Sequence, residues 1–548
     1  MVTYTSDFPD RVLPKTNLYS FIASNPNKTS DSSTLLIDDV TKRTITFGEW
    51  KRDARRWATG LQSIGFKRGD VLAIYSSNQV DYSIAMFGPL ILGAITTTVN
   101  SFYTVDELAF QLTDSGATAI VTQPESLATT IEAAKAVGIS KDRIFLFGGK
   151  AIEGFQPYSS IFPPIDTPTS SLAPILSLDG DAAVDSTALI CYSSGTTGRS
   201  KGVELTHYNL SSNLLQMNAY EHDIHPHDDR TLNVLPMYHI YGIMSHLLDG
   251  IYNGIFNIIM PRFNPEGFLQ AIQEYKVKSL NLVPPQALVF IKSPLVPKYD
   301  LSSLRHISVG AAPCSKEFVE SLLQRLPQIR FRQLYGMTEL SPMVAQGYFH
   351  NCVLGSVGRS VSNQEIRIID PETGKDVAAG TPGELIARGP NVMKGYRNNP
   401  QATKTSIDAD GWFHTGDTAK VDKDGNIFVV DRLKELIKYK GFQVPPAELE
   451  DILLTHPHVA DAAVIGVELK AEATEVPIAY VVRHEGKELS DKEVSDFVAA
   501  RVAPYKKLRG GVRFVELIPK SPSGKILRKE LRERLKQEMH DRSVTAKL

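Results

Sequence analysis

The chain has 548 residues, of which 42% are hydrophobic and 22% charged, and a formal net charge of −2. This length allows several structural units with a large core, and the near-neutral charge excludes an overall field that would attract nucleic acid or an anionic membrane. The three cysteines, Cys191, Cys314 and Cys352, form no CxxC pair. The sequence therefore favours a reducing compartment over a disulfide framework or a thiolate zinc site.

The N-terminal segment, MVTYTSDFPDRV, is polar and carries Asp7 and Asp10, which argues against a secretory signal. The most apolar long stretch, 82–99, is interrupted by Gly88 and Pro89. A membrane span needs about 20 uninterrupted apolar residues. The stretch therefore predicts a buried helix followed by a strand, and we expect no membrane span.

Through the first three quarters of the chain, short apolar runs alternate with helical patterns. A helix is expected from Thr206, and the Pro-, Ser- and Asp-rich stretch 156–186 predicts an exposed connection. Strands alternating with helices are typical of α/β architecture with largely parallel sheets. The predicted strands are VLAIYSS (71–77), TAIVTQ (118–123), ALICYSS (188–194), SLNLVPP (279–285) and RHISVG (305–310).

After residue 360, EIRIID, the turn PETGK, a Gly-Glu-Leu strand and the turn at 422–426 predict antiparallel strands and hairpins. A second boundary is expected near 431–434. Beyond it, the pattern predicts a helix opened by a capping box at 490–493 and a final helix with one docked apolar face. The other elements expected there are a helix at 446–454 and strands at 459–466, 477–483 and 512–518. The apolar face of the final helix comprises Leu527, Leu531, Leu535 and Met539.

A loop rich in serine, threonine and glycine, 193–202, follows the strand predicted at 188–194. Its glycines let the backbone approach an anion, its hydroxyls can donate hydrogen bonds, and Lys201 adds a cation. It is not a Walker A loop, because Lys201 is preceded by Ser200 and followed by Gly202. Taken alone, the loop fits a phosphate cradle or a flexible turn. The candidate phosphate-binding residues are Ser193, Ser194, Gly195, Thr196, Thr197, Gly198 and Lys201.

The string SSGTTGRSKGV resembles the signature of the adenylate-forming superfamily, which includes acyl-CoA synthetases, 4-coumarate–CoA ligases, beetle luciferases and peptide-synthetase adenylation domains. The resemblance spans essentially the whole chain and is greatest to 4-coumarate–CoA ligases and luciferases. Later motifs follow in the family's order: PMYHIYG (236–242), VGAAP (309–313), YGMTE (335–339), GEL (383–385), DGWFHTGD (410–417), DRLKELIKYKGFQVPPAELE (431–450) and PKSPSGKILRKELR (519–532).

The resemblance implies an α/β fold in two domains. Residues 1–432 would form a large domain of stacked mixed sheets with helices and a β-rich subdomain. Residues 433–548 would form a small mobile α+β domain. It also implies that ATP and magnesium activate a carboxylic acid as an acyl-adenylate, which coenzyme A converts to a thioester.

The resemblance assigns a role to each motif. The 193–202 loop would hold the β- and γ-phosphates, the Glu339 carboxylate would bind magnesium, and the Thr338 hydroxyl would lie near the α-phosphate. Asp417 and Arg432 would contact the ribose, because a carboxylate can accept two hydrogen bonds from a diol. Lys525 would bridge the acid and the α-phosphate during adenylation, and His239 would lie near the acyl carboxylate and the thiol path. Further nucleotide- and CoA-binding positions implied are Gly310, Ala311, Ala312, Gln333, Tyr335, Gly336, Met337, Lys434, Lys438, Gly441 and Gln443.

The resemblance further implies a hinge near Lys434 that replaces the Lys525 loop with the 436–443 strand for the thioester step. It also implies an acyl pocket in which small Gly310 and Gly336 admit a flat or slender acid. An aryl or hydroxycinnamic acid is the first expectation, and a medium-chain fatty acid the second. The pocket residues are His239, Ile240, Tyr241, Val309, Gly310, Gly336, Pro342 and Met343.

Three other functions fit the same motifs: a luciferase-type oxygenase, an amino-acid-activating enzyme and an inactive binding protein. The His/Asp stretch between a helix and a strand has no recognised zinc spacing, so we expect no metal there. No activated thiolate is expected at Cys314. The terminal tripeptide is one residue from a peroxisomal address, which predicts an import receptor as a partner and a peroxisomal, otherwise cytoplasmic, location. The His/Asp stretch comprises His222, His225, His227, Asp228 and Asp229, and the tripeptide Ala546, Lys547 and Leu548.

Overall fold

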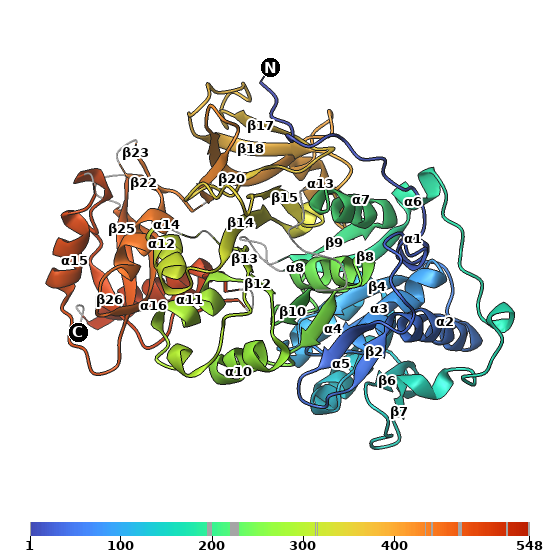
Figure 1. Ribbon diagram of the computed structural model, residues 1–548. Coiled ribbons are helices and arrows are strands. Elements are labelled where there is room, and N and C mark those ends of the chain that lie inside the picture. Colours follow the sequence, from blue (N-terminus) through green and yellow to red (C-terminus); the bar gives the residue numbers. More distant parts are fainter. Residues whose placement is uncertain are drawn as a thin grey trace.

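The computed structural model describes residues 2–193, 200–219, 229–312, 314, 316–432, 435–439, 442–469, 474–502, 504–521 and 524–545. Within these ranges the chain forms two large mixed sheets with helices, a four-stranded antiparallel sheet and a separate C-terminal lobe (Figure 1). The α-helices are α1 (Leu18–Ala23), α2 (Phe47–Ser63), α3 (Tyr82–Ile91), α4 (Val105–Ser115), α5 (Leu127–Val137), α6 (Asp181–Asp185), α7 (His207–Met217), α8 (Ile240–Gly242), α9 (Asp249–Tyr252), α10 (Pro265–Tyr275), α11 (Pro284–Lys292), α12 (Lys316–Arg325), α13 (Pro400–Ser406), α14 (Pro446–Leu454), α15 (Asp491–Ala499) and α16 (Arg528–Thr545).

The first sheet is parallel from β8 to β7 and antiparallel at the edge where β9 and β19 pair. Its central strands β3 and β4 are buried along their whole length, because helices cover both faces. In spatial order it contains β19 (Gly395–Tyr396), β9 (Lys201–Thr206), β8 (Thr187–Ser193), β4 (Ile95–Val99), β3 (Val71–Tyr75), β5 (Ala117–Thr122), β6 (Ile144–Leu146) and β7 (Gln156–Pro157).

The second sheet is parallel from β14 to β1, with antiparallel strands at both edges. Its order is β16 (Arg359–Ser360), β15 (Met343–Gln346), β14 (Arg330–Gly336), β13 (His306–Val309), β12 (Ser279–Leu282), β10 (Arg230–Asn233), β11 (Phe256–Ile259), β1 (Thr34–Asp38) and β2 (Thr44–Thr46).

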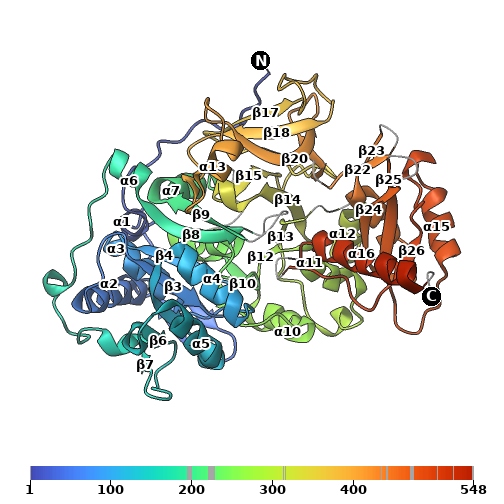
Figure 2. The same ribbon diagram turned by 180° about the vertical axis from the view of Figure 1, so that it is seen from behind.

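The third sheet is antiparallel, and the C-terminal lobe follows it in the chain (Figures 1 and 2). The third sheet contains β17 (Glu365–Ile369), β18 (Gly383–Arg388), β20 (Phe413–Val421) and β21 (Ile427–Arg432). The lobe contains the pair β22 (Ile437–Tyr439) and β23 (Phe442–Val444), and the sheet β24 (Val459–Leu469), β25 (Thr474–Arg483) and β26 (Val512–Phe514).

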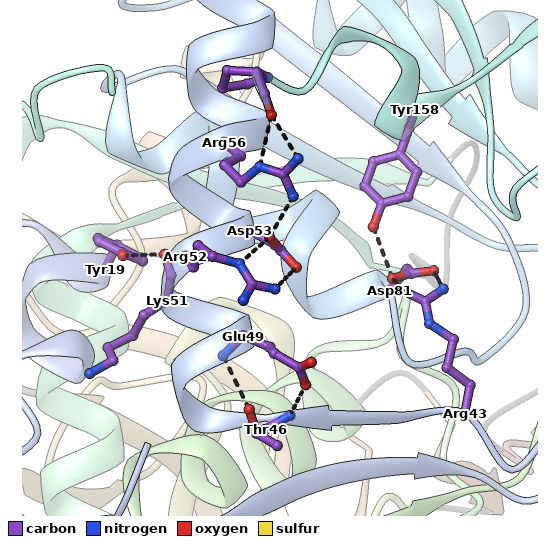
Figure 3. A network of polar contacts seen from close by, with 11 residues as sticks. Tyr19, Arg43, Thr46, Glu49, Lys51, Arg52, Asp53, Arg56, Asp81 and Tyr158 are labelled. Carbon is purple, nitrogen blue, oxygen red and sulfur yellow. Dashed lines mark hydrogen bonds and ion pairs between the residues drawn. The ribbon is translucent and has the colours of Figure 1, made fainter. Parts of the chain in front are cut away.

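The largest apolar core joins both large sheets and the helices between them. Within it, the ring centroids of Trp50 on α2 and Phe87 on α3 lie 5.1 Å apart. Separate cores lie under α10–α12, under α4 and α5, and on the two faces of β24–β25. Helix α2 begins with a capping box in which Thr46 and Glu49 bond each other's backbone. Figure 3 shows the ion pairs of Asp53 with Arg52 and Arg56 within the same helix, and Arg56 also donates to the Pro163 carbonyl oxygen outside it.

The structure confirms most of the predicted elements, including the helix and strand within 82–99 and the capping box at Ser490. The strand predicted at 279–285 is too long, because Pro284 and Pro285 begin α11, a position where proline fits a helix. The strand predicted at 512–518 ends at Phe514. Strand β9, between the 193–202 loop and α7, was not predicted. None of the described helices is long and apolar enough to cross a bilayer.

Candidate active site

The serine- and glycine-rich loop connects two paired strands of the first sheet. Strand β8 ends at Ser193 and β9 begins at Lys201, and these two residues are partners in the antiparallel ladder. The Nζ atom of Lys201 lies 4.6 Å from the ring centroid of Tyr396. The other predicted loop residues, Ser194, Gly195, Thr196, Thr197 and Gly198, lie outside the described residues.

Glu339 and Thr338 lie on a short turn that directly follows β14. Thr338 is buried, whereas Glu339 is half-buried. The Tyr396 hydroxyl donates to Glu339 Oε1 at 3.0 Å, and the Met393 N–H donates to the Glu339 carbonyl oxygen at 2.9 Å. The second carboxylate oxygen of Glu339 has no hydrogen-bond partner in the described part of the chain. An available hard oxygen fits magnesium, which takes one or two protein carboxylates besides phosphate oxygens.

Asp417 is buried on β20, where the Tyr335 hydroxyl donates to its Oδ2 at 2.6 Å. The turn before it is held by Glu384, which accepts from the Gly416 N–H at 3.1 Å and contacts His414 Nδ1 at 3.1 Å. This hydrogen bond raises the pKa of His414. Glu384 belongs to the GEL motif but has no role among the sequence-based predictions, although its carboxylate in that motif was the available signal.

The remaining predicted nucleotide positions gather at one sheet edge. Strands β13 and β14 are parallel neighbours with Val309 opposite Gln333, so the turns after both strands lie together. Gln333 is buried and its Oε1 atom has no partner among the described residues. Ala311 adopts a left-handed backbone with φ of 69°. The positions at this edge are Gly310, Ala311, Ala312, Gln333, Tyr335, Gly336 and Met337.

Lys525 comes from the C-terminal lobe, in a hairpin closed by the pairing of Lys520 with Ile526. Gly524 has φ of 79°, and Pro285 Cγ lies 3.1 Å from where its Cβ would stand, so this close approach requires glycine. Burial, together with the charge of Lys525, lowers the pKa of His239 to about 4. The hairpin therefore brings Lys525 toward His239, a residue far away in the sequence.

Helix α11 is the surface on which the C-terminal lobe rests. Besides Pro285 at its start, its last residue, Lys292, donates from Nζ to the Val459 carbonyl oxygen at 3.5 Å. The predicted thioester-step strand lies elsewhere: β22 and β23 form the upper edge of the lobe in Figures 1 and 2. Lys438 and Gln443 are partners in that pair. For Arg432, which lies opposite Asp417, and for Lys438 and Gln443 only the backbone is described; Lys434 and Gly441 lie outside the described residues.

The predicted acyl pocket is only partly assembled as expected. His239 caps α8, and its Nδ1 accepts from the Tyr241 N–H at 3.2 Å. Ile240, Tyr241 and Met343 belong to the largest core, whereas Val309 packs in the separate core under α10–α12. The Tyr241 hydroxyl is buried and has no partner in the described ranges.

The two small residues of that pocket serve different purposes. Tyr241 Cε1 lies 3.5 Å from the place of a Cβ on Gly310, so Gly310 borders the tyrosine ring. A Cβ on Gly336 would stand 2.3 Å from the Pro342 carbonyl oxygen. Glycine is therefore required at 336 by the close approach of the chain itself. Burial raises the pKa of Cys314, which keeps this thiol protonated. His222, His225, His227 and Asp228 lie outside the described residues.

Comparisons with known proteins show the family to which the chain is similar. Residues 23–397 match the model of the AMP-binding enzyme family, and residues 448–525 match the AMP-binding enzyme C-terminal domain. The chain is 41% identical to a 4-coumarate–CoA ligase of Pinus taeda, with 97% of both chains covered. It is 39% identical to 4-coumarate-CoA ligase 1 of Narcissus pseudonarcissus, covering 98% of this chain and 97% of the relative.

Solved structures extend the likeness. ATP-bound MatB of Rhodopseudomonas palustris is 28% identical with a TM-score of 0.83, and the match covers 94% of this chain and 98% of MatB. The anthranilate CoA ligase AuaEII with anthranoyl-AMP has a TM-score of 0.86 at 22% identity, covering 97% of this chain and 99% of AuaEII, and supports the fold alone. On the family models and the full-length relatives together, the chain belongs to the AMP-binding enzyme family.

Proposed function

We propose that this protein is an ATP-dependent acid–CoA ligase, which forms an acyl-adenylate and then an acyl-CoA thioester. The observation that supports it most is the packing of the Lys525 hairpin, from one lobe, against Pro285 at the start of α11, from the other, where the charge of Lys525 also lowers the pKa of His239. Glu339 and Lys201 provide further charges around the sheet edge where Asp417 and Gln333 also lie. Two relatives, 41% and 39% identical over nearly the whole chain, are named 4-coumarate–CoA ligases.

In the first step, a carboxylate oxygen of the acid attacks the α-phosphorus of ATP and pyrophosphate leaves. Bringing two unit negative charges to about 4 Å costs about 4 kcal/mol at an effective dielectric of 20. Lys525 offsets this repulsion between the acid and the α-phosphate. Lys201 and the 193–202 loop hold the outgoing phosphates, and the Thr338 hydroxyl donates at the α-phosphate. Magnesium held at Glu339 would neutralise phosphate charge.

The nucleoside half of ATP is held by Asp417 and the turns after β13 and β14. Asp417 accepts from the ribose hydroxyls, with Tyr335 keeping its carboxylate in place. His239 is neutral at pH 7, so it orients the acid through a hydrogen bond and does not act as a cation. In the second step the thiol of coenzyme A attacks the acyl carbon and AMP leaves. For that step the lobe turns near Lys434, and the 436–443 strand with Lys438, Gly441 and Gln443 replaces the hairpin of Lys525.

The buried hydroxyls beside the acyl site favour an aryl or hydroxycinnamic acid over a medium-chain fatty acid. Tyr241 Oη and Ser245 Oγ are both buried and have no partner among the described residues. A buried hydroxyl without a partner costs about 1–3 kcal/mol, which an alkyl chain cannot recover. A hydroxyl or carbonyl at the far end of an aryl acid can recover it.

Purified protein incubated with ATP, magnesium, coenzyme A and a panel of acids tests the proposal. We expect AMP and an acyl-CoA with 4-hydroxycinnamic acid, and weaker turnover with octanoic acid. Light with luciferin and oxygen, or ATP–pyrophosphate exchange stimulated by amino acids, would instead support one of the other two enzyme functions. ATP binding without adenylate from any acid would support an inactive binding protein.

We also propose import into peroxisomes through Ala546, Lys547 and Leu548, which lie outside the described residues. A fluorescent protein ending in the last twelve or so residues should enter peroxisomes, and the same fusion without the tripeptide should stay in the cytoplasm.

A further inference from the structure

Residues 393–397 connect the strand that leaves the 193–202 loop with the turn that carries Glu339. Tyr396 and Val203 are partners in the pairing of β19 with β9, and the Arg397 N–H donates to the Gly202 carbonyl oxygen at 2.7 Å. At the other end, the Met393 N–H donates to the Glu339 carbonyl oxygen at 2.9 Å. Five residues of backbone therefore join two parts of the site that are far apart in the sequence.

The side chain of Tyr396 makes the same connection. It is 9% exposed, its hydroxyl donates to Glu339 Oε1 at 3.0 Å, and Lys201 Nζ lies 4.6 Å from its ring centroid. The backbone of Tyr396 is held in place as well, because its N–H donates to Thr403 Oγ1 at 2.8 Å. One fixed tyrosine thus contacts a carboxylate with its hydroxyl and an ammonium with its ring.

Within the described part of the chain, Lys201 and Glu339 have no ion-pair partner, and they form none with each other. A lysine and a glutamate that contact the same side chain would ordinarily attract each other and form an ion pair. Here the lysine contacts the negative face of the ring and the carboxylate accepts from the hydroxyl at its edge.

We propose that Tyr396 is a positioning residue for the ATP reaction: it holds Glu339 and Lys201 apart, so that the carboxylate remains available to a divalent cation and the ammonium to phosphate. This inference rests on the proposed function for the identity of the ligands, ATP and its metal. No role for Tyr396 could be predicted from the sequence, because its contacts are with residues far away in the chain. The hydroxyl acts on the metal side and the ring on the phosphate side, so the two contributions can be separated.

The test uses Tyr396→Phe, Tyr396→Leu and the matched control Tyr299→Phe in the full chain. Tyr299 also donates to a glutamate, Glu266, at 3.3 Å, but on the exposed surface. Calorimetric titration with a non-hydrolysable ATP analogue, with and without Mn²⁺, measures binding without any acid. The Mg²⁺ dependence of adenylate formation is measured beside it.

For Tyr396→Phe we expect roughly tenfold more metal for half-saturation, as for the loss of one hydrogen bond to a charged group, and metal-free nucleotide affinity within about twofold of the parent. Tyr396→Leu should in addition weaken metal-free nucleotide binding by about threefold, since the ring under Lys201 is lost. Tyr299→Phe should change neither titration.

A double-mutant cycle separates positioning from general support of the fold. If Tyr396 acts through Glu339, adding Tyr396→Phe to Glu339→Gln should not shift the Mn²⁺ titration further. A lower melting temperature with an unchanged metal titration would overturn the inference, as would equal shifts in the parent and Glu339→Gln backgrounds. The binding titration needs no acid, so its result can be interpreted even if the ligase proposal fails.

Discussion

Two polar regions of this molecule, the ion pairs around α2 and the candidate active site, differ in whether their polar groups have partners. Near α2, Asp53 accepts from Arg52 at 2.9 Å and from Arg56 at 3.0 Å (Figure 3). Asp81 accepts from Tyr158 at 2.9 Å and from both guanidinium nitrogens of Arg43. A cavity of about 310 Å³ borders this network, but the charged groups that line it are already bonded.

In the active site, by contrast, several groups lack a protein partner within the described ranges. They include the hydroxyl of Tyr241, the Oε1 atom of Gln333 and the second carboxylate oxygen of Glu339, and Lys201 contacts the Tyr396 ring without an ion-pair partner there. Paired polar groups stabilise one conformation, whereas unpaired ones raise the free energy of the empty protein and are recovered by a ligand. The comparison predicts that substitutions near α2 change stability and substitutions in the site change turnover.

The largest effect is expected from Lys525→Ala. Losing the cation between two anionic reactants should slow adenylate formation by about 10²–10³. Thioester formation from supplied acyl-AMP should stay near the parent rate, because the hairpin is withdrawn in that step. Single-turnover assays of the two half-reactions measure this, with Lys529→Ala on the exposed face of α16 as the control. Equal loss in both half-reactions would contradict the assigned division of labour.

The next effect tests the α2 region. Asp81→Asn leaves Arg43 without its counter-ion and should lower the free energy of unfolding by about 1–3 kcal/mol. Turnover per folded molecule should not change. Asp300→Asn, which breaks the exposed pair with Lys276, should change the free energy of unfolding much less, because water screens that pair. Denaturant unfolding and adenylation assays on both variants measure stability and turnover separately. A loss of turnover in fully folded Asp81→Asn protein would contradict the difference between the two regions.

His207 shares features of both regions, because one of its ring nitrogens is hydrogen-bonded and the other has no partner in the described residues. Burial lowers the pKa of His207 to about 3, and its Nδ1 accepts from the Leu18 N–H at 3.0 Å while its Nε2 has no partner in the described residues. The unfolded chain takes up the proton below about pH 6.5 and the folded chain does not. Stability is therefore complete above that pH and falls as the pH is lowered toward 3, by at most about 1.4 kcal/mol per pH unit.

His207→Asn, which retains an acceptor for the Leu18 N–H, should remove this share of the acid sensitivity. Melting temperatures of the variant and the parent, recorded from pH 7.5 to pH 4.5, should converge as the pH falls. A constant difference at every pH would mean that the substitution acts through packing and not through the proton.

How much of these two regions could be predicted from the sequence depends on how far apart in the chain the interacting residues lie. Buried strands such as β3 were predictable because apolar runs of this length have few alternatives. Strand β9 was missed because its pairing with β8 depends on the preceding loop. The roles of Glu384 and Tyr396 were missed for a related reason: their partners, Gly416 and Glu339, lie 32 and 57 residues away. Motifs predict which residues act, but only the fold shows which residues hold them in place.

The smallest predicted effect sharpens the comparison inside the site. Tyr241→Phe removes a buried hydroxyl that has no partner in the described chain, so the empty protein should be as stable as the parent or slightly more stable. With 4-hydroxycinnamic acid, kcat/KM should fall by about tenfold, the usual size for one lost hydrogen bond; with cinnamic acid it should change by less than about threefold. Steady-state assays on this pair isolate the hydroxyl, since the acids differ in one oxygen. An equal fall with both acids would assign Tyr241 to packing against the ring, and the polar end of the acyl site would have to lie elsewhere.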